Sequence, residues 1–208
     1  MAGRWSQRRT PCAVIFVALL VTAFTIAGGG RAQQAPAPTA DLIARAAKAR
    51  ELTHVYSEKL RTGLAEAMKE GGPVGAIGAC NTLAPDLNAS VTDSSTFEIS
   101  RTSLRLRNPE NAPDAWEQAV LEQFQKAVSG GADAKALETF DVVTTTEGQR
   151  LFRYMRPIVT GEACLACHGP NVATDVKAEI AKYYSDDKAI GYSLGEMRGA
   201  FSLVQQLE

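Results

Sequence analysis

The spacing of apolar residues near the start of the sequence predicts helices. From Asp41 to about Lys69, leucine, alanine and tyrosine recur every three or four positions, which gives this segment one apolar face. We expect a long helix that is capped by Asp41 and ended by Gly71-Gly72. Pro73 begins a second, short helical stretch, and LAPDLNASV supplies a further turn or two.

The later segments predict a small antiparallel sheet with helical and loop inserts. FEISRTSLRL (97–106) is the first strand candidate, with a bend or bulge where its apolar parity changes. Asp114 and Glu117 form a capping-box start for a helix that ends before Gly130. FDVVTT and RLFRYMRPIV, joined across TEGQ, predict a β-hairpin, KAEIAKYY a helix and AIGYSLGEMRGAFSLVQQ the last strand pair. These elements favour an α+β fold in one domain, residues 41–208.

The N-terminus has the pattern of an export signal. MAGRWSQRRTPC is basic and AVIFVALLVTAFTIA carries no charge, which predicts a signal peptide over residues 1–32, cleaved after Ala32. A retained membrane anchor is the alternative, although the run is short for a span, which needs about 20 apolar residues. QQAPAPTA (33–40) is a linker. We expect a periplasmic protein with no membrane attachment after cleavage.

Charge and cysteine content narrow the function classes. Cleavage would remove four arginines and no acid, leaving 18 basic and 23 acidic residues and a net charge of −5, which does not suit nucleic-acid binding. Cys12 would also be lost, leaving Cys80, Cys164 and Cys167. An odd number of cysteines in an oxidising compartment needs an explanation.

The segment CLACH (164–168) admits three chemistries, two of which fit poorly. A zinc site needs four ligands, but Cys80 and His54 are single residues far from the cluster. A thioredoxin-like thiol oxidoreductase places its CxxC between a strand and a helix of a βαβ unit, whereas this sheet is predicted to be antiparallel and Gly169-Pro170 interrupts a following helix.

Covalent attachment of haem c explains the whole segment. Cys164 and Cys167 have the spacing that lets two thioethers reach one porphyrin edge, and His168 follows as an iron ligand. Attachment takes place outside the cytoplasm, in agreement with the predicted signal. The sequence therefore predicts one covalent haem c, attached with the help of the cytochrome c maturation machinery.

The second axial ligand is not decided by spacing alone. His54 lies on the polar side of the long helix, and Met68, Met155 and Met197 are more often core or surface residues than ligands. Met155, just before the attachment segment, is the best of the methionines. Cys80, among small residues in VGAIGACNTLAP, is either a buried small side chain or an iron ligand.

Four blocks of the sequence resemble a known family. GACNTLAP, RTSLRLRNPENAPDAWE, RYMRPIV with CLACHG, and KYYSDDKAIGYSLGEMRGAFS are similar, in this order, to c-type haem domains with a PAS-like fold. This resemblance covers about residues 42–204 and implies that His168 and the Cys80 thiolate are the axial ligands. Arg101, in the RTS block, is a candidate contact for a haem propionate; further candidates are Arg105, Arg107, Arg150, Arg153 and Arg156.

The resemblance favours a sensor over a catalyst. A thiolate ligand favours ferric iron, and its loss on reduction would open a site for a diatomic gas, so we expect redox or small-gas sensing with an unidentified redox or signalling partner. A periplasmic electron carrier is the alternative, and a thiol oxidoreductase using Cys164 and Cys167 is a further one. Haem enzymes usually keep one axial position open, so ligation on both faces predicts a non-enzymatic protein.

Overall fold

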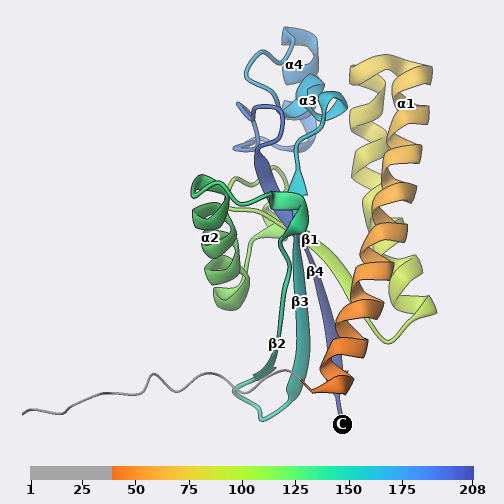
Figure 1. The fold of residues 1–208 in the computed structure, drawn as a ribbon. Helices are drawn as coiled ribbons and strands as arrows, with labels where there is room; N and C mark the ends of the chain where they lie inside the picture. The colour runs from red at the N-terminus through yellow and green to blue at the C-terminus, as the bar shows by residue number, and fades with distance from the viewer. Residues whose placement is uncertain (1–38) are drawn as a thin grey trace, which may run out of the picture. The chain divides into compact units, whose positions relative to one another are not determined.

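A twisted antiparallel sheet forms the centre of the protein, in a computed structural model that describes residues 39–208 apart from the Cys80 side chain (Figure 1). The signal peptide predicted for residues 1–32 and the linker residues 33–38 lie outside the described part. The strand order is β1-β4-β3-β2, and all neighbouring strands are antiparallel. The strands are β1 (Glu98–Thr102), β2 (Thr139–Thr144), β3 (Arg150–Val159) and β4 (Met197–Leu207). The predicted α+β class and the predicted β2–β3 hairpin are confirmed.

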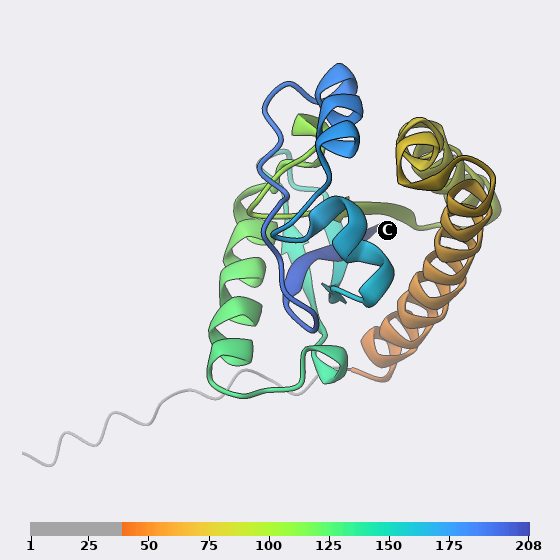
Figure 2. The ribbon, with the colours of Figure 1, turned by 90° about the horizontal axis from the view of Figure 1, so that it is seen from above.

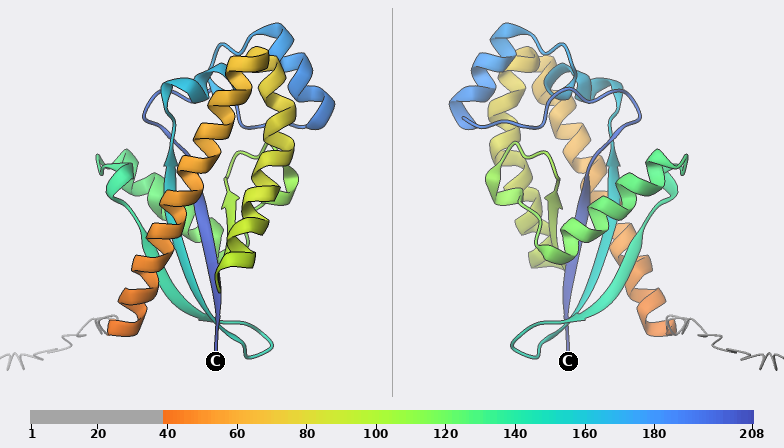
Figure 3. Two further views of the ribbon diagram at one scale, coloured as in Figure 1. Left: turned by 90° about the vertical axis from the view of Figure 1, so that its right-hand side faces the viewer. Right: turned by 90° about the vertical axis from the view of Figure 1, so that its left-hand side faces the viewer.

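Helix α1 (Ala40–Ser94) is a helical hairpin that folds back at Gly72 (Figure 3). Its N-cap is Thr39, whose hydroxyl accepts from Leu42 N at 3.4 Å, so the prediction of Asp41 as the cap is wrong by two residues. The predicted linker likewise ends earlier, because Ala40 is already helical. Glycine ends the first half as predicted.

The second half of α1 is longer than the sequence predicts. It continues to Ser94 through Pro85, whereas the sequence predicted a short stretch from Pro73 and a further turn or two over LAPDLNASV. Apolar side chains at helical spacing along this half are packed against the rest of the fold: Ile77, Ala84, Leu87 and Val91. Burial of this face is the physical reason that the helix continues.

Gly72→Ala is expected to destabilise the protein by about 1–3 kcal/mol, because φ 62° and ψ −167° at Gly72 lie in a region that only glycine adopts readily. Gly71→Ala is the matched control, since nothing lies within 4 Å of the added methyl group there. That variant should be neutral, or more stable by up to about 1 kcal/mol. Urea denaturation of both variants checks the difference; equal midpoints would contradict it.

Helices cover both faces of the sheet, with α1 on one side and α2 (Ala115–Ser129) on the other (Figure 2). Successive residues of β3 face opposite layers: Phe152 and Tyr154 pack with α1, whereas Met155 packs with α2. The predicted capping box at the start of α2 is present, with Glu117 N donating to Asp114 Oδ1 at 2.9 Å and Asp114 N donating to Glu117 Oε2 at 3.0 Å.

A third, smaller apolar cluster joins α4 (Thr174–Tyr183) to the second half of α1. Its buried members are Ile77, Val172, Val176 and Ile180. Tyr184, at the end of α4, donates its hydroxyl proton to Asn81 Oδ1 at 3.1 Å. The hairpin is therefore held at one end by the sheet and at the other by α4.

Two predictions about strands are corrected. The strand expected over 97–106 ends at Thr102, because the Ser103 hydroxyl binds the carbonyl oxygen of Arg198 at 2.8 Å and the chain turns away there. The last strand pair is one strand, β4, preceded by a loop whose Tyr192 N donates to His168 O at 2.9 Å.

The short helical turns are η1 (Pro109–Asn111), η2 (Ala134–Ala136), η3 (Glu162–Cys164) and α3 (Leu165–His168). Within residues 39–208, no helix is both long and apolar enough to cross a membrane.

Candidate functional site

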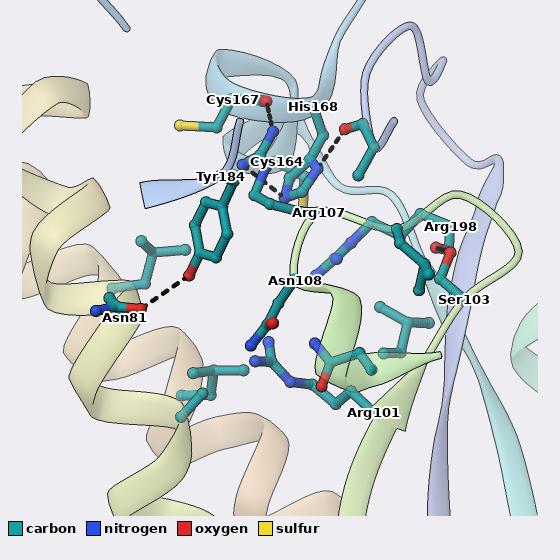
Figure 4. Close-up of a pocket in the computed structure, with 18 of the residues that line it drawn as sticks. Asn81, Arg101, Ser103, Arg107, Asn108, Cys164, Cys167, His168, Tyr184 and Arg198 are labelled. Carbon is teal, nitrogen blue, oxygen red and sulfur yellow. Dashed lines mark hydrogen bonds between the residues drawn. The ribbon is translucent and has the colours of Figure 1, made fainter. Parts of the chain in front are cut away.

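A cavity of about 340 Å³ lies between α1, the segment after β1, α3 and the start of β4. This volume falls in the range of about 300–1,000 Å³ found for small-molecule and cofactor sites. Apolar side chains from both halves of α1 form one wall, including Leu60, Leu64, Ile77 and Ala84. Arginines and the CLACH segment form the opposite wall (Figure 4).

The CLACH segment is a compact turn at the end of β3. After Val159 the chain enters η3 and then α3, so Cys164, Cys167 and His168 lie within about one helical turn and all three line the cavity. Gly169 closes the turn by donating its N–H to Leu165 O at 3.0 Å. A Cβ at Gly169 would lie 2.5 Å from the same oxygen, so a side chain there would push the turn open. The three residues therefore lie together in one closed turn at the edge of the cavity.

His168 is oriented by a backbone carbonyl. Its Nδ1 lies 2.7 Å from Ala189 O, which fixes the tautomer with the proton on Nδ1. Nε2 then carries the lone pair, and it accepts from Arg107 Nη1 at 3.5 Å. Burial, with the charges of Arg198 and Arg107, lowers the pKa of His168 to about 3, so the imidazole is neutral at physiological pH. A neutral imidazole with one orienting hydrogen bond is the usual arrangement of a metal-ligating histidine.

Arg107 connects the three segments around His168. Its Nη2 donates to Cys167 O at 2.6 Å and to Asp187 Oδ2 at 2.9 Å. The other oxygen of Asp187 accepts from Ala189 N at 2.9 Å, and Ala189 is the residue that binds the histidine ring. This network fixes the imidazole from both sides. The sequence singled out Arg107 only as one of several arginines, and it gave no indication of Asp187 or Ala189.

The structure separates the candidates for a second ligand. Met155 is wrong as a candidate, because it is fully buried on the α2 side of the sheet, away from the cavity, and Met197 packs in the same cluster. His54 is exposed on α1, as expected. Met68 lines the cavity, which the sequence did not indicate.

Cys80 belongs to the part of α1 that borders the cavity. Position 80 is three or four residues from Ile77 and Ala84 and next to Asn81, all of which line the cavity. The side chain of Cys80 lies outside the described part, so its role as a ligand stays a prediction.

The predicted arginines divide into two groups. Arg101, Arg105 and Arg107 line the cavity. Arg153 lies on the opposite side of the sheet, where Nη1 binds Asp114 Oδ2 at 2.6 Å. The other two are elsewhere: Arg150 is exposed, and Arg156 donates to Lys135 O at 2.8 Å. The prediction of Arg101 as a propionate contact is not tested, but Arg101 does lie at the cavity.

One cavity arginine, Arg198 on β4, was missed by the sequence analysis. The segment MRGAFSLV places a single charged residue at the start of an otherwise apolar strand, and this is the signal that could have found it. Its carbonyl oxygen accepts from Ser103, so its backbone is fixed against the segment after β1. The Nε of Arg198 is shielded from water and has no hydrogen-bond partner in the described part of the chain.

The family model described as Tll0287-like: Tll0287 matches residues 32–205. The chain belongs to the Tll0287-like family. The match covers most of the chain and includes every residue of the cavity described above. The family resemblance that the sequence indicated is confirmed.

A solved structure shows the fold of this Tll0287-like chain in another protein. The crystal structure of the cyanobacterial heme-protein Tll0287 matches with a TM-score of 0.60 and 20% sequence identity, over 82% of this chain and 98% of that chain. The PAS-like arrangement predicted for the Tll0287-like chain is thereby confirmed. No curated protein matches it.

Proposed function

We propose that this chain is an exported c-type haem protein that senses redox state or a small gas. The observation that carries the proposal is His168, which borders a cavity of cofactor size with Nδ1 held by Ala189 O and Nε2 left as the acceptor. Cys164 and Cys167 line the same cavity. The similar fold of the cyanobacterial heme-protein Tll0287 supports the choice of haem.

The residues of the cavity fit this cofactor in their chemistry. Cys164 and Cys167 would attach the two vinyl groups, and Nε2 of His168 would bind the iron in place of Arg107. The wall formed by α1 is apolar, as a porphyrin face requires, whereas Arg101 supplies positive charge for a propionate. Bound haem would supply an iron that changes oxidation state and binds diatomic ligands.

The ligation by Cys80 that the family resemblance implies is the reason for proposing a sensor. We take Cys80 as the second axial ligand, on the second half of α1, whereas His168 belongs to α3. The two ligands would tie α1 to the segment after β3. Release of the thiolate on reduction would remove that tie, and a partner that contacts α1 would detect the change.

The proposed location follows from the chemistry of attachment. Thioether formation at CxxCH takes place outside the cytoplasm, so the chain would be exported by residues 1–32 to the periplasm and would meet the cytochrome c maturation machinery there. The experiment is the mass of the denatured protein after expression with that machinery. A mass increment of one haem supports the proposal, and a chain that has the polypeptide mass alone contradicts it.

A further inference from the structure

The cavity carries more positive charge than the chain itself compensates. Arg107 pairs with Asp187 at 2.9 Å, and Arg105 lies 3.7 Å from Glu196 and stacks on the Tyr192 ring at 4.1 Å. Within residues 39–208, no ion pair is formed by the other two cavity arginines, Arg101 and Arg198. No acid in the described part of the chain therefore neutralises these two charges.

Arg198 is the more confined of the two. Its neighbour Gly199 lies so close to β1 that a Cβ would be 2.5 Å from Thr102 O, which fixes this part of β4 against β1. Burial lowers the pKa of Arg198, and the charge of Arg101 acts in the same direction, whereas the Cys164 thiol and Tyr192 oppose them. The guanidinium thus lies near Cys164, among the side chains that line the cavity (Figure 4).

Arg198 lines the same cavity as His168, the proposed iron ligand. Conversion of Cys164 to a thioether would leave a sulfur that accepts hydrogen bonds only weakly, so it could not compensate the guanidinium. A fixed, poorly screened positive charge would then remain beside the haem site.

We infer that Arg198 sets the reduction potential of the haem by stabilising the ferrous state. The inference rests on the proposed function. Reduction adds one electron to the site, so the reduced form is one charge more negative, and a half-buried cation in the same cavity as His168 favours it. A thiolate from Cys80 would favour the ferric state. Arg198 would offset that effect and keep the potential within reach of a one-electron donor.

The test is a redox titration of the haem-loaded full-length protein, with chemical mediators, for wild type, Arg198→Met, Arg198→Gln and Arg198→Lys. At a given applied potential, the two neutral variants should have a ferrous-to-ferric ratio at least tenfold lower than wild type. This corresponds to a fall in the reduction potential of about 59 mV for one electron. Arg198→Lys keeps the charge and should recover most of the shift. An unchanged or raised potential in the neutral variants would overturn the inference.

Arg153→Met is the matched control. Arg153 is buried, but it lies on the α2 side of the sheet between Asp114 and Glu117, so its loss should weaken the fold without changing the potential. Denaturation of the haem-free chain gives a second measurement. Arg198→Met should raise the urea midpoint because it removes a half-buried charge that no acid in the described part of the chain pairs with, whereas Arg153→Met should lower it because it breaks two ion pairs. A lower midpoint for Arg198→Met would count against the inference, whereas the absence of a haem mass increment in wild type would contradict the proposed function instead.

Discussion

Replacement of both Cys164 and Cys167 by serine is expected to abolish covalent haem attachment. Serine keeps the size and position of the side chains on η3 and α3, but its hydroxyl does not form the thioether. After expression with the maturation machinery, the denatured double variant should have the mass of the polypeptide alone. Each single variant should keep one thioether, because one attachment cysteine remains. Its yield of haem-loaded protein should fall, because the second attachment is lost.

The matched control for this experiment is Cys80→Ser. Position 80 lies on α1, on the other side of the cavity from the CLACH turn, and serves no attachment in the proposal. The Cys80→Ser protein should therefore keep the mass increment of one haem. A haem increment that survives denaturation in the double variant would show that attachment uses other residues, and the proposed roles of Cys164 and Cys167 would be wrong.

Cys80→Ala is expected to remove the low-spin, thiolate-ligated signature of the ferric protein. Optical and electron-spin-resonance spectra of the ferric and ferrous forms measure this change. Because a thiolate donates electron density to ferric iron, its loss should also raise the reduction potential. We expect a rise of at least about 59 mV, which is a tenfold higher ferrous-to-ferric ratio at a given applied potential. Cys80→Ala and the neutral Arg198 variants should thus move the potential in opposite directions.

Met68→Leu is the control for the second axial ligand. Met68 is the methionine that the structure places at the cavity, and leucine keeps its volume while removing the sulfur. The spectra of Met68→Leu should equal those of wild type. If instead Met68→Leu changes the spectra and Cys80→Ala does not, the iron has His/Met ligation. The electron-carrier alternative would then replace the sensor as the first candidate.

The parts of the fold that sequence predicts correctly are the ones encoded by short segments. The capping box of Asp114 and Glu117 lies within a few residues, and so does the TEGQ turn between β2 and β3. Each signal is local, so it needs no knowledge of the tertiary structure.

The parts that sequence mispredicts depend on distant contacts. A proline such as Pro85 disfavours a helix interior because it removes a backbone hydrogen bond. The helix nevertheless continues through Pro85, because its apolar face packs against the rest of the fold. Met155 precedes the attachment turn in the sequence, yet strand alternation directs it to the α2 side, away from the cavity. Arg198 and Ala189 reach the site only because β4 and its preceding loop lie beside β1 and α3. No periodicity in the chain encodes that adjacency.

The two ends of the α1 hairpin pack on apolar clusters of different size, and this difference determines which end of the molecule opens first. The end next to the sheet packs on the main core with Tyr56 and Val91, whereas the Gly72 end rests on the small cluster around Ile77 and on the Tyr184–Asn81 hydrogen bond. Regions with few buried apolar contacts open at lower free energy than the global unfolding transition. Amide protons near Ile77 and in α4 should therefore exchange with solvent earlier than those of β3 and β4. Since that end also borders the cavity, solvent and small solutes would enter through this local opening while the sheet stays folded.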